Sequence, residues 1–301
     1  MLIATSIATA GTRETPAARA EIERFAGPYP SAQFGTLKRI YATHINDAGF
    51  PKGEVTAGLK YGPNERHRLD VIAPTVASEG PAPVLVFVHG GAFVRGERSD
   101  GHIYDNVLHY FARHGFVGIN ATYRLAPQHQ WPAAAEDLAN VVAWVRENAA
   151  RYGGDPGRIF LMGHSAGAVH VASYAFMESL QPSGGSDGVL GAVLLSGVYG
   201  DAADRIGDHV YFGASPKQRV PLHFVDGRAI PLFVIDSEYD PVGMQRSALE
   251  LVDAVCRRDG RCPRHLQVAG HNHFSMVFHI NTLDDSLSPH ILDFLRSHAD
   301  D

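Results

Sequence analysis

The stretch Arg158-Ile-Phe-Leu-Met-Gly-His-Ser-Ala-Gly-Ala168 decides the fold of this chain. Its apolar run, residues 159–162, predicts a buried strand, because the side chains on both faces of that strand are hydrophobic. The run leads into Gly163-His-Ser-Ala-Gly167, which has the pattern G-x-S-x-G. Apolar residues at helical spacing then predict a helix from Ala166 to Ser179. We therefore expect a sharp strand-to-helix turn with Ser165 at its tip.

Two interpretations of this turn are open. A serine nucleophile must stand clear of the backbone, and glycines at positions 163 and 167 remove the Cβ atoms that would collide in so sharp a turn. The following helix would add backbone N–H groups and a partial positive charge beside Ser165. The alternative is an ordinary strand-to-helix turn, so the rest of the chain has to decide.

Strands and helices alternate along that remainder. Apolar runs predict strands at residues 84–89, 116–123, 189–196, 231–237 and 265–268, preceded by an edge strand at 68–73. Helical spacing predicts one helix that opens at residue 99 or 100 and others over 133–152, 247–258 and 288–298. Residues 197–230 are expected to be loop. The alternation predicts an α/β fold with a mostly parallel central sheet and helices on both faces.

Residues 1–55 lack strand patterning, and we expect them to be an N-terminal extension to a single domain over residues 56–301. Thr15 as N-cap and Pro16 at the first helical position predict a helix from Thr15 to Phe25. The extension is either a small lid or an arm packed on the surface, and the sequence leaves both open.

Composition narrows the class of protein. With 45% hydrophobic and 19% charged residues, the 301-residue chain is typical of a globular protein. A net charge of −6 and the lack of a basic run argue against a nucleic-acid partner. No stretch approaches the roughly 20 apolar residues of a membrane-spanning helix, and the N-terminus has no basic segment of the signal-peptide kind. We therefore predict no membrane partner and a cytoplasmic location.

The two cysteines, Cys256 and Cys262, allow a small disulfide loop or two separate thiols. Thiols are the favoured interpretation, because nothing else in the sequence suggests export.

Polar residues with complementary chemistry follow four predicted strands. Ser165, the glycine loop at residues 89–91, Asp240 and His273 each lie just beyond the end of a strand. The carboxyl ends of parallel strands meet at one edge of a sheet, so these groups should lie close together. A neutral histidine can take the proton of a serine hydroxyl, and an acid on the far side of the ring stabilises the imidazolium. The pattern predicts nucleophilic catalysis by a serine.

Each role has competitors. Asp236 and Glu238 compete with Asp240 for the acid, but Asp236 should still lie in the strand and Glu238 precedes the turn. His271 competes with His273 for the base, and on the residues alone that choice stays open. His279 should belong to a following helix, with a structural role.

His164, inside the sharp turn, should pack beside the nucleophile rather than act as base. A metal site at His271-x-His273 is disfavoured, because no third ligand has a defined place.

Several short motifs together resemble the α/β-hydrolase superfamily, and in detail its hormone-sensitive-lipase-like (alpha/beta hydrolase fold-3) esterases. The resemblance covers roughly residues 65–298. Its motifs are His89-Gly90-Gly91-Ala92-Phe93, Tyr123-Arg124-Leu125-Ala126-Pro127, Trp131-Pro132-Ala133-Ala134, Gly153-Gly154-Asp155-Pro156, Gly163-His-Ser-Ala-Gly167, Glu238-Tyr-Asp240-Pro241 and Gly270-His-Asn-His273-Phe274. The resemblance makes residues 56–301 the catalytic domain.

The resemblance implies a role for each matching residue. Ser165 would be the nucleophile, Asp240 the acid and His273 the base, in the chain order typical of the superfamily. The backbone N–H groups of Gly91, Ala92 and Ala166 would form the oxyanion hole. Ala92 stands where the family usually has a third glycine. Through Arg66-His-Arg-Leu-Asp-Val71 and the tail Gly270-His-Asn-His-Phe-Ser275, the chain also resembles arylformamidases (kynurenine formamidases). A homodimer is the family expectation for its assembly.

These observations predict a serine carboxylesterase that acts on small to medium acyl esters, a small-molecule substrate, without a metal or organic cofactor. An arylformamidase that uses the same triad on N-formylkynurenine is the alternative, and a non-catalytic binding protein on the same fold is a remote one. Four aromatic residues are expected to line the pocket, with core packing as the other interpretation: Phe93, Trp131, Phe212 and Phe274.

Overall fold

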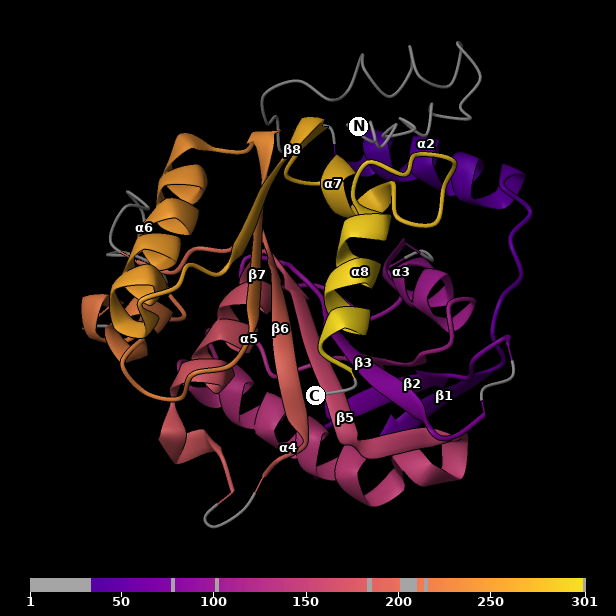
Figure 1. The fold of residues 1–301 in the computed structure, drawn as a ribbon, viewed down its shortest axis with the longest axis horizontal. Coiled ribbons are helices and arrows are strands. Elements are labelled where there is room, and N and C mark those ends of the chain that lie inside the picture. Colours follow the sequence, from indigo (N-terminus) through magenta and orange to yellow (C-terminus); the bar gives the residue numbers. More distant parts are fainter. Residues whose placement is uncertain are drawn as a thin grey trace, which may run out of the picture.

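An eight-stranded sheet forms the centre of the computed structural model (Figure 1), which describes residues 34–76, 79–100, 103–182, 186–200, 210–213 and 216–299. The strands lie in the order β1-β2-β4-β3-β5-β6-β7-β8, and all pairs from β4 to β8 are parallel. Strand β2 is antiparallel to both of its neighbours, β1 and β4. Their bounds are β1 Val55–Lys60, β2 Arg68–Ile72, β3 Ala82–Val88, β4 Val117–Ala121, β5 Gly154–His164, β6 Val189–Leu195, β7 Leu232–Tyr239 and β8 Arg264–Asn272. The predicted mostly parallel sheet is confirmed.

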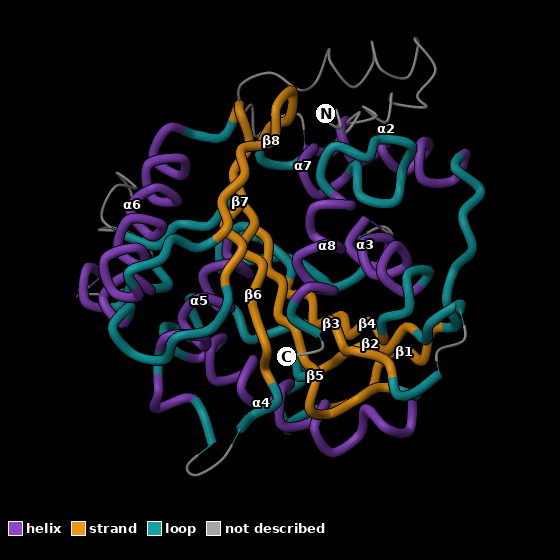
Figure 2. The backbone as a smooth tube through the Cα atoms, viewed as in Figure 1, coloured by secondary structure: helices purple, strands orange, loops and turns teal. Residues whose placement is uncertain are grey.

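Helices cover both faces of this sheet (Figure 2). The α-helices are α2 Phe34–Asp47, α3 Ile103–Ala112, α4 Ala133–Asn148, α5 Ala166–Phe176, α6 Val242–Asp259, α7 Ser275–Phe278 and α8 Ser288–Ser297. Short 3-10 turns lie at Ala149–Tyr152, Glu178–Leu180, Pro216–Gln218 and Pro221–Phe224.

Alternation along β3 shows how the two faces are filled. Val84, Val86 and Val88 pack with α4, α5 and α6 in one core, whereas Leu85 and Phe87 pack with α2, α3, α7 and α8 in the other. Because successive side chains of a strand point to opposite faces, an unbroken apolar run is what a strand buried on both sides requires.

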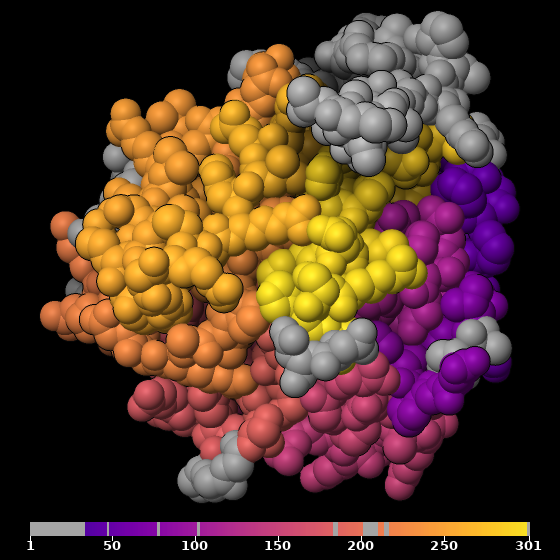
Figure 3. Space-filling view, in the orientation of Figure 1, coloured from indigo at the N-terminus to yellow at the C-terminus, as the bar shows by residue number. Residues whose placement is uncertain are grey.

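Two described elements were not predicted. Helix α2 lies inside the expected N-terminal extension, where it packs on α3 and α7. Figure 1 shows it beside α7, and Figure 3 shows the C-terminal part of the chain filling this face between α6 and α2. Strand β1 escaped detection because most of its residues are exposed and its sequence lacks apolar alternation. The helix predicted at Thr15–Phe25 lies outside the described residues.

Several predicted boundaries differ from the structure. Helix α5 ends at Phe176, whereas the sequence predicted an end at Ser179. The helix predicted over 133–152 is α-helical only to Asn148. Strand β5 begins at Gly154, before the apolar run. Among the described residues, no helix is both long enough and apolar enough to cross a bilayer.

Cys256 and Cys262 form a disulfide, so the preference for two thiols was wrong. Helix α6 ends at Asp259, and Gly260 follows in a left-handed conformation with φ of 67°. Glycine adopts this conformation at little cost. The reversal returns the chain toward the last turn of α6, which leaves the two Cα atoms 4.1 Å apart.

Candidate active site

Ser165 stands at the tip of the turn between β5 and α5. Its φ of 56° and ψ of −119° are strained for a residue with a side chain. A Cβ at Gly163 would lie 2.3 Å from the carbonyl oxygen of Gly167, and one at Gly167 would lie 2.1 Å from that of Val88. Both positions are therefore restricted to glycine by steric contact, which is the arrangement expected of a nucleophile elbow.

The structure brings Ser165, His273 and Asp240 into one hydrogen-bonded chain. His273 follows β8, and its Nε2 lies 3.0 Å from Ser165 Oγ. Asp240 follows β7, and its Oδ1 lies 3.0 Å from His273 Nδ1. His273 and Asp240 are buried. In this geometry Nδ1–H donates to Asp240, which leaves the lone pair of Nε2 facing the serine hydroxyl.

The competing acids have other partners. Asp236 lies within β7, where its carboxylate accepts from Gln267 and pairs with His265. Glu238 accepts a hydrogen bond from the backbone N–H of Gly270.

The competing bases are engaged elsewhere as well. His271 pairs with Asp284 at 3.2 Å, and His279 donates from Nδ1 to the carbonyl of Ser275 at 2.8 Å. His279 caps the end of α7. Of the acids and histidines weighed for the two roles, Asp240 and His273 are the ones that connect to Ser165.

Asp240 is held as a buried carboxylate. Burial alone would raise its pKa, but the hydrogen bond and charge of His273, followed by hydrogen bonds from Ser196 Oγ and Ser237 N–H, hold the pKa below its usual value. Sequence reasoning missed Ser196, which lies just past the end of β6 at the same edge of the sheet. That position was the signal that could have found it.

His164 contacts the backbone of the base. Its Nε2 lies 2.8 Å from the carbonyl oxygen of His273, and Tyr104 OH lies 3.4 Å from its Nδ1. Burial and the neighbouring His273 lower the pKa of His164 to about 3, so the ring is neutral near pH 7. The neutral tautomer with a proton on Nε2 donates to the carbonyl of His273.

The glycine loop passes directly beside the nucleophile. A Cβ at Gly90 would lie 3.1 Å from Ser165 Cβ, and one at Gly91 would lie 1.9 Å from the carbonyl oxygen of Arg95. Ala92 and Phe93 both have positive φ, at 50° and 67°. Strain of this kind is costly and is typical of loops whose backbone groups face a ligand.

Of the four predicted pocket residues, three adjoin this site. Phe93 stacks on Tyr211 with ring centroids 4.7 Å apart and meets Phe212 edge-on at 5.3 Å. Phe274 lies 5.2 Å from the ring of His273 and contacts Phe34 of α2 at 4.9 Å. Trp131 instead stacks on Phe224 at 5.8 Å.

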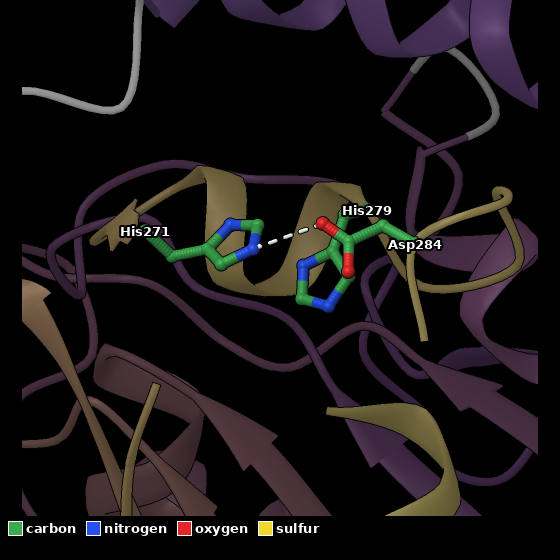
Figure 4. A group of neighbouring side chains, drawn as sticks. All are labelled: His271, His279 and Asp284. Carbon is green, nitrogen blue, oxygen red and sulfur yellow. Dashed lines mark hydrogen bonds and ion pairs between the residues drawn. The ribbon is translucent and has the colours of Figure 1, made fainter. Parts of the chain in front are cut away.

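One group among the described residues resembles a metal site. His271, His279 and Asp284 are buried, with ligand atoms within 4.8 Å of one another (Figure 4). The two imidazole rings, however, are stacked 4.1 Å apart with only 27° between their planes. Ligands on one metal ion must converge on it from well-separated directions, so stacked rings do not fit a shared ion. The two histidines of the His271-x-His273 pair, which the sequence disfavoured as a metal site, have different partners: His271 pairs with Asp284, whereas His273 faces Ser165.

Comparison with known proteins relates this chain to esterases. The family model BD-FAE matches residues 69–182. Esterase LipC of Mycobacterium tuberculosis is 35% identical over 231 residues, and Esterase LipQ of the same species is 32% identical over 212 residues. Over the matched residues, this chain is similar to α/β-hydrolase esterases. The matches cover 65% and 62% of it, and 55% and 49% of the two relatives, so the chain spans about half the length of the relatives it matches.

Solved structures confirm the α/β-hydrolase fold. Esterase B from Lactobacillus rhamnosis superposes with a TM-score of 0.70 at 17% identity, over 95% of this α/β-hydrolase and 97% of that chain. The Pyrobaculum calidifontis esterase superposes with a TM-score of 0.66 at 20% identity, over 95% and 98%. The predicted α/β-hydrolase fold is therefore confirmed.

Proposed function

We propose that this α/β-hydrolase is a serine carboxylesterase that hydrolyses small to medium acyl esters. The observation that carries the proposal is the hydrogen-bonded chain Ser165–His273–Asp240 beside the strained loop at residues 89–93. The sequence relatives named above are esterases, which supports the same reaction class.

The reaction begins at the Ser165 hydroxyl. His273 Nε2 accepts the hydroxyl proton while Oγ bonds to the ester carbonyl carbon, and the carbonyl π electrons move to oxygen. Backbone N–H groups of Gly91, Ala92 and Ala166 donate to this oxyanion. A single donor of this kind is worth about 2.7–4 kcal/mol in measured cases. The Asp240 carboxylate stabilises the imidazolium form of His273.

Collapse of the intermediate breaks the ester bond. The alkoxide leaves with the proton from His273 Nε2, which frees an alcohol and leaves the acyl group on Ser165. A water molecule then gives a proton to His273 and attacks the acyl carbon. The second collapse returns the proton to Ser165 and releases the carboxylic acid. The protein's own groups are sufficient for both half-reactions.

An aromatic cluster that includes Phe93, from the loop at residues 89–93, is expected to favour short acyl groups. Phe93 follows Ala92 in the chain and packs with Tyr211 and Phe212 in a buried cluster. We expect this cluster to limit the space for the acyl group. Packed aromatic rings make a rigid wall, because core side chains have little free volume around them.

A substrate panel tests the proposal. We expect purified protein to turn over p-nitrophenyl acetate and butyrate faster than the octanoate or palmitate, and Ser165→Ala to remove this activity. A much higher kcat/KM for N-formylkynurenine would favour the arylformamidase alternative with the same triad. Absence of labelling by a fluorophosphonate would favour the non-catalytic alternative. The cytoplasmic location and the homodimer stay predictions.

A further inference from the structure

The turn that carries His273 is closed by its own hydrogen bonds. Ser275 Oγ accepts from the backbone N–H of Asn272 at 2.9 Å. Asn272 Oδ1 accepts from the backbone N–H groups of Phe274 and Ser275 at 3.0 and 2.9 Å. These bonds fix the backbone on both sides of His273. A side chain that holds Ser275 therefore also holds the base.

Ser275 and four residues that lie behind this turn form one hydrogen-bonded cluster. We call the cluster the base anchor: His271, Ser275, His279, Asp284 and Ser286. His271 Nδ1 lies 3.1 Å from Ser275 Oγ. The Nε2 atom of His271 lies 3.2 Å from Asp284 Oδ2, and the dashed line in Figure 4 marks this second contact. His279 Nδ1–H donates to the carbonyl of Ser275 at 2.8 Å. Ser286 Oγ lies 3.2 Å from His271 Nε2 and 3.3 Å from His279 Nε2.

One arrangement of protons satisfies every one of these contacts. Ser275 Oγ–H donates to His271 Nδ1, and His271 Nε2–H donates to Asp284, with Ser286 Oγ nearby as a second acceptor. Ser286 Oγ–H donates to His279 Nε2, and Ser286 N–H donates to Asp284 Oδ1 at 2.9 Å. A buried polar network is stabilising only when its members are all satisfied in this way.

The charge of the base anchor is also accounted for. Burial alone would raise the pKa of Asp284, but the hydrogen bond from His271 holds it well below its usual range. Asp284 is therefore a buried anion that His271 stabilises. The cluster is complete as a hydrogen-bonded unit, whereas the stacked imidazole rings do not fit a metal ion.

We propose that His271 and Asp284 are positioning residues, which hold the His273 ring in line with Ser165 through Ser275. The inference rests on the proposed triad. Displacing a reacting group by about 1 Å can cost roughly 100-fold in rate. Loss of the anchor should therefore lower kcat, while the substrate contacts that set KM are retained.

The chain offers a matched control at the other end of β8. His265 Nε2 lies 2.7 Å from Asp236 Oδ1, which makes a second histidine–carboxylate pair between β7 and β8. Asp236 is buried, as Asp284 is. The control pair lies six positions before His271 on the same strand, and its histidine is absent from the base anchor.

The test compares His271→Leu with His265→Leu, using p-nitrophenyl butyrate at a temperature well below both Tm values. We expect His271→Leu to lower kcat by about 10- to 100-fold with KM within about twofold, and to slow fluorophosphonate labelling to a similar extent. His265→Leu should keep kcat within about twofold. His271→Gln retains a donor toward Asp284 and should recover part of the lost kcat.

Ser286→Ala supplies a milder probe if His271→Leu fails to fold, and it should lower kcat by several-fold. Unchanged kcat in folded His271→Leu, or in Ser286→Ala where His271→Leu does not fold, would overturn the proposal. An equal loss of kcat in His265→Leu would overturn it as well. One zinc ion per chain, with loss of activity on chelation, would overturn it in favour of a metal site. If Ser165→Ala stays active, the triad itself fails. An inactive Ser165→Ala beside a fully active His271→Leu rejects only the anchor.

Discussion

Strands β7 and β8 carry two aspartate–histidine pairs with the same chemistry and different surroundings. In one pair, Asp236 and His265 meet at 2.7 Å part-way along the strands, and the His265 side chain is 28% exposed. In the other, Asp240 and His273 meet at 3.0 Å just past the strand ends, with both side chains buried. Only the second pair lies where the elbow presents a hydroxyl. Position at the carboxyl edge of the sheet, more than the pairing, separates the candidate base from a structural histidine.

The largest expected effect comes from removing the hydroxyl that distinguishes the two pairs. Ser165→Ala should lower kcat for p-nitrophenyl butyrate by about 10⁶-fold, since loss of a serine nucleophile had that scale in a measured triad. The Tm should stay close to that of the parent protein. Retained turnover would show that the second pair is no more catalytic than the first.

The next largest effect is expected from removing the acid of the second pair, with the acid of the first pair as the comparison. Asp240→Asn should lower kcat by about 10⁴-fold, because an amide no longer fixes the histidine tautomer or stabilises the imidazolium. Asp236→Asn should leave kcat within a few-fold. Comparable losses in both variants would contradict the comparison. The measurement is the steady-state kcat of both variants, made at matched fractions of folded protein.

His164 sharpens the comparison, because it contacts only the second pair. His164→Leu removes the donor to the His273 carbonyl and should lower kcat by about 10-fold, by loosening the base relative to Ser165. Tyr104→Phe removes the longer contact at 3.4 Å and should change kcat by less than about threefold. The reverse order of effects would mean that His164 acts through packing alone.

The smallest expected effect is on stability. Burial lowers the pKa of His164 to about 3 and that of His279 to about 4, from an unfolded value near 6.5. Below pH 6.5 the unfolded chain binds protons that the folded chain excludes, so the free energy of unfolding falls as the pH drops from 6.5 toward 4. The slope is at most about 1.4 kcal/mol per pH unit for each histidine.

Urea unfolding at pH 7.5, 6.5 and 5.5 measures this slope. His164→Leu should flatten it, since one proton-excluding site is lost. A free energy of unfolding that does not change over this range would contradict the assignment of His164 and His279 as buried neutral rings.

Local sequence patterns were enough for most of the fold. The unbroken apolar run of β3 and the run before Gly163 identified central strands correctly, because burial on both faces leaves no room for polar residues. Strand β1 lacked this signal, since it lies at the sheet edge with most side chains exposed. Helix α2 was missed for a related reason: its packing on α3 and α7 is a relation between distant segments.

The candidate site divides in the same way. Ser165 and Asp240 could be placed from the sequence, because each follows a strand and parallel strands deliver their ends to one edge. The strand ends left His271 and His273 open, and only the resemblance favoured His273. Trp131 stacks on Phe224, a contact that the sequence did not indicate, and its place in the pocket stays a prediction. An aromatic residue near a motif carries no information about which neighbour its ring meets.

The sequence by itself determined the α/β fold, the sharp turn at Ser165 and the strand ends that carry the candidate triad, because each depends on residues close together along the chain. Only the tertiary structure decided the Cys256–Cys262 disulfide, the contact of His164 with His273 and the pairing of His271 with Asp284. Those contacts depend on how the backbone reverses and on which distant atoms it brings within hydrogen-bonding distance. No periodicity in the sequence records that geometry.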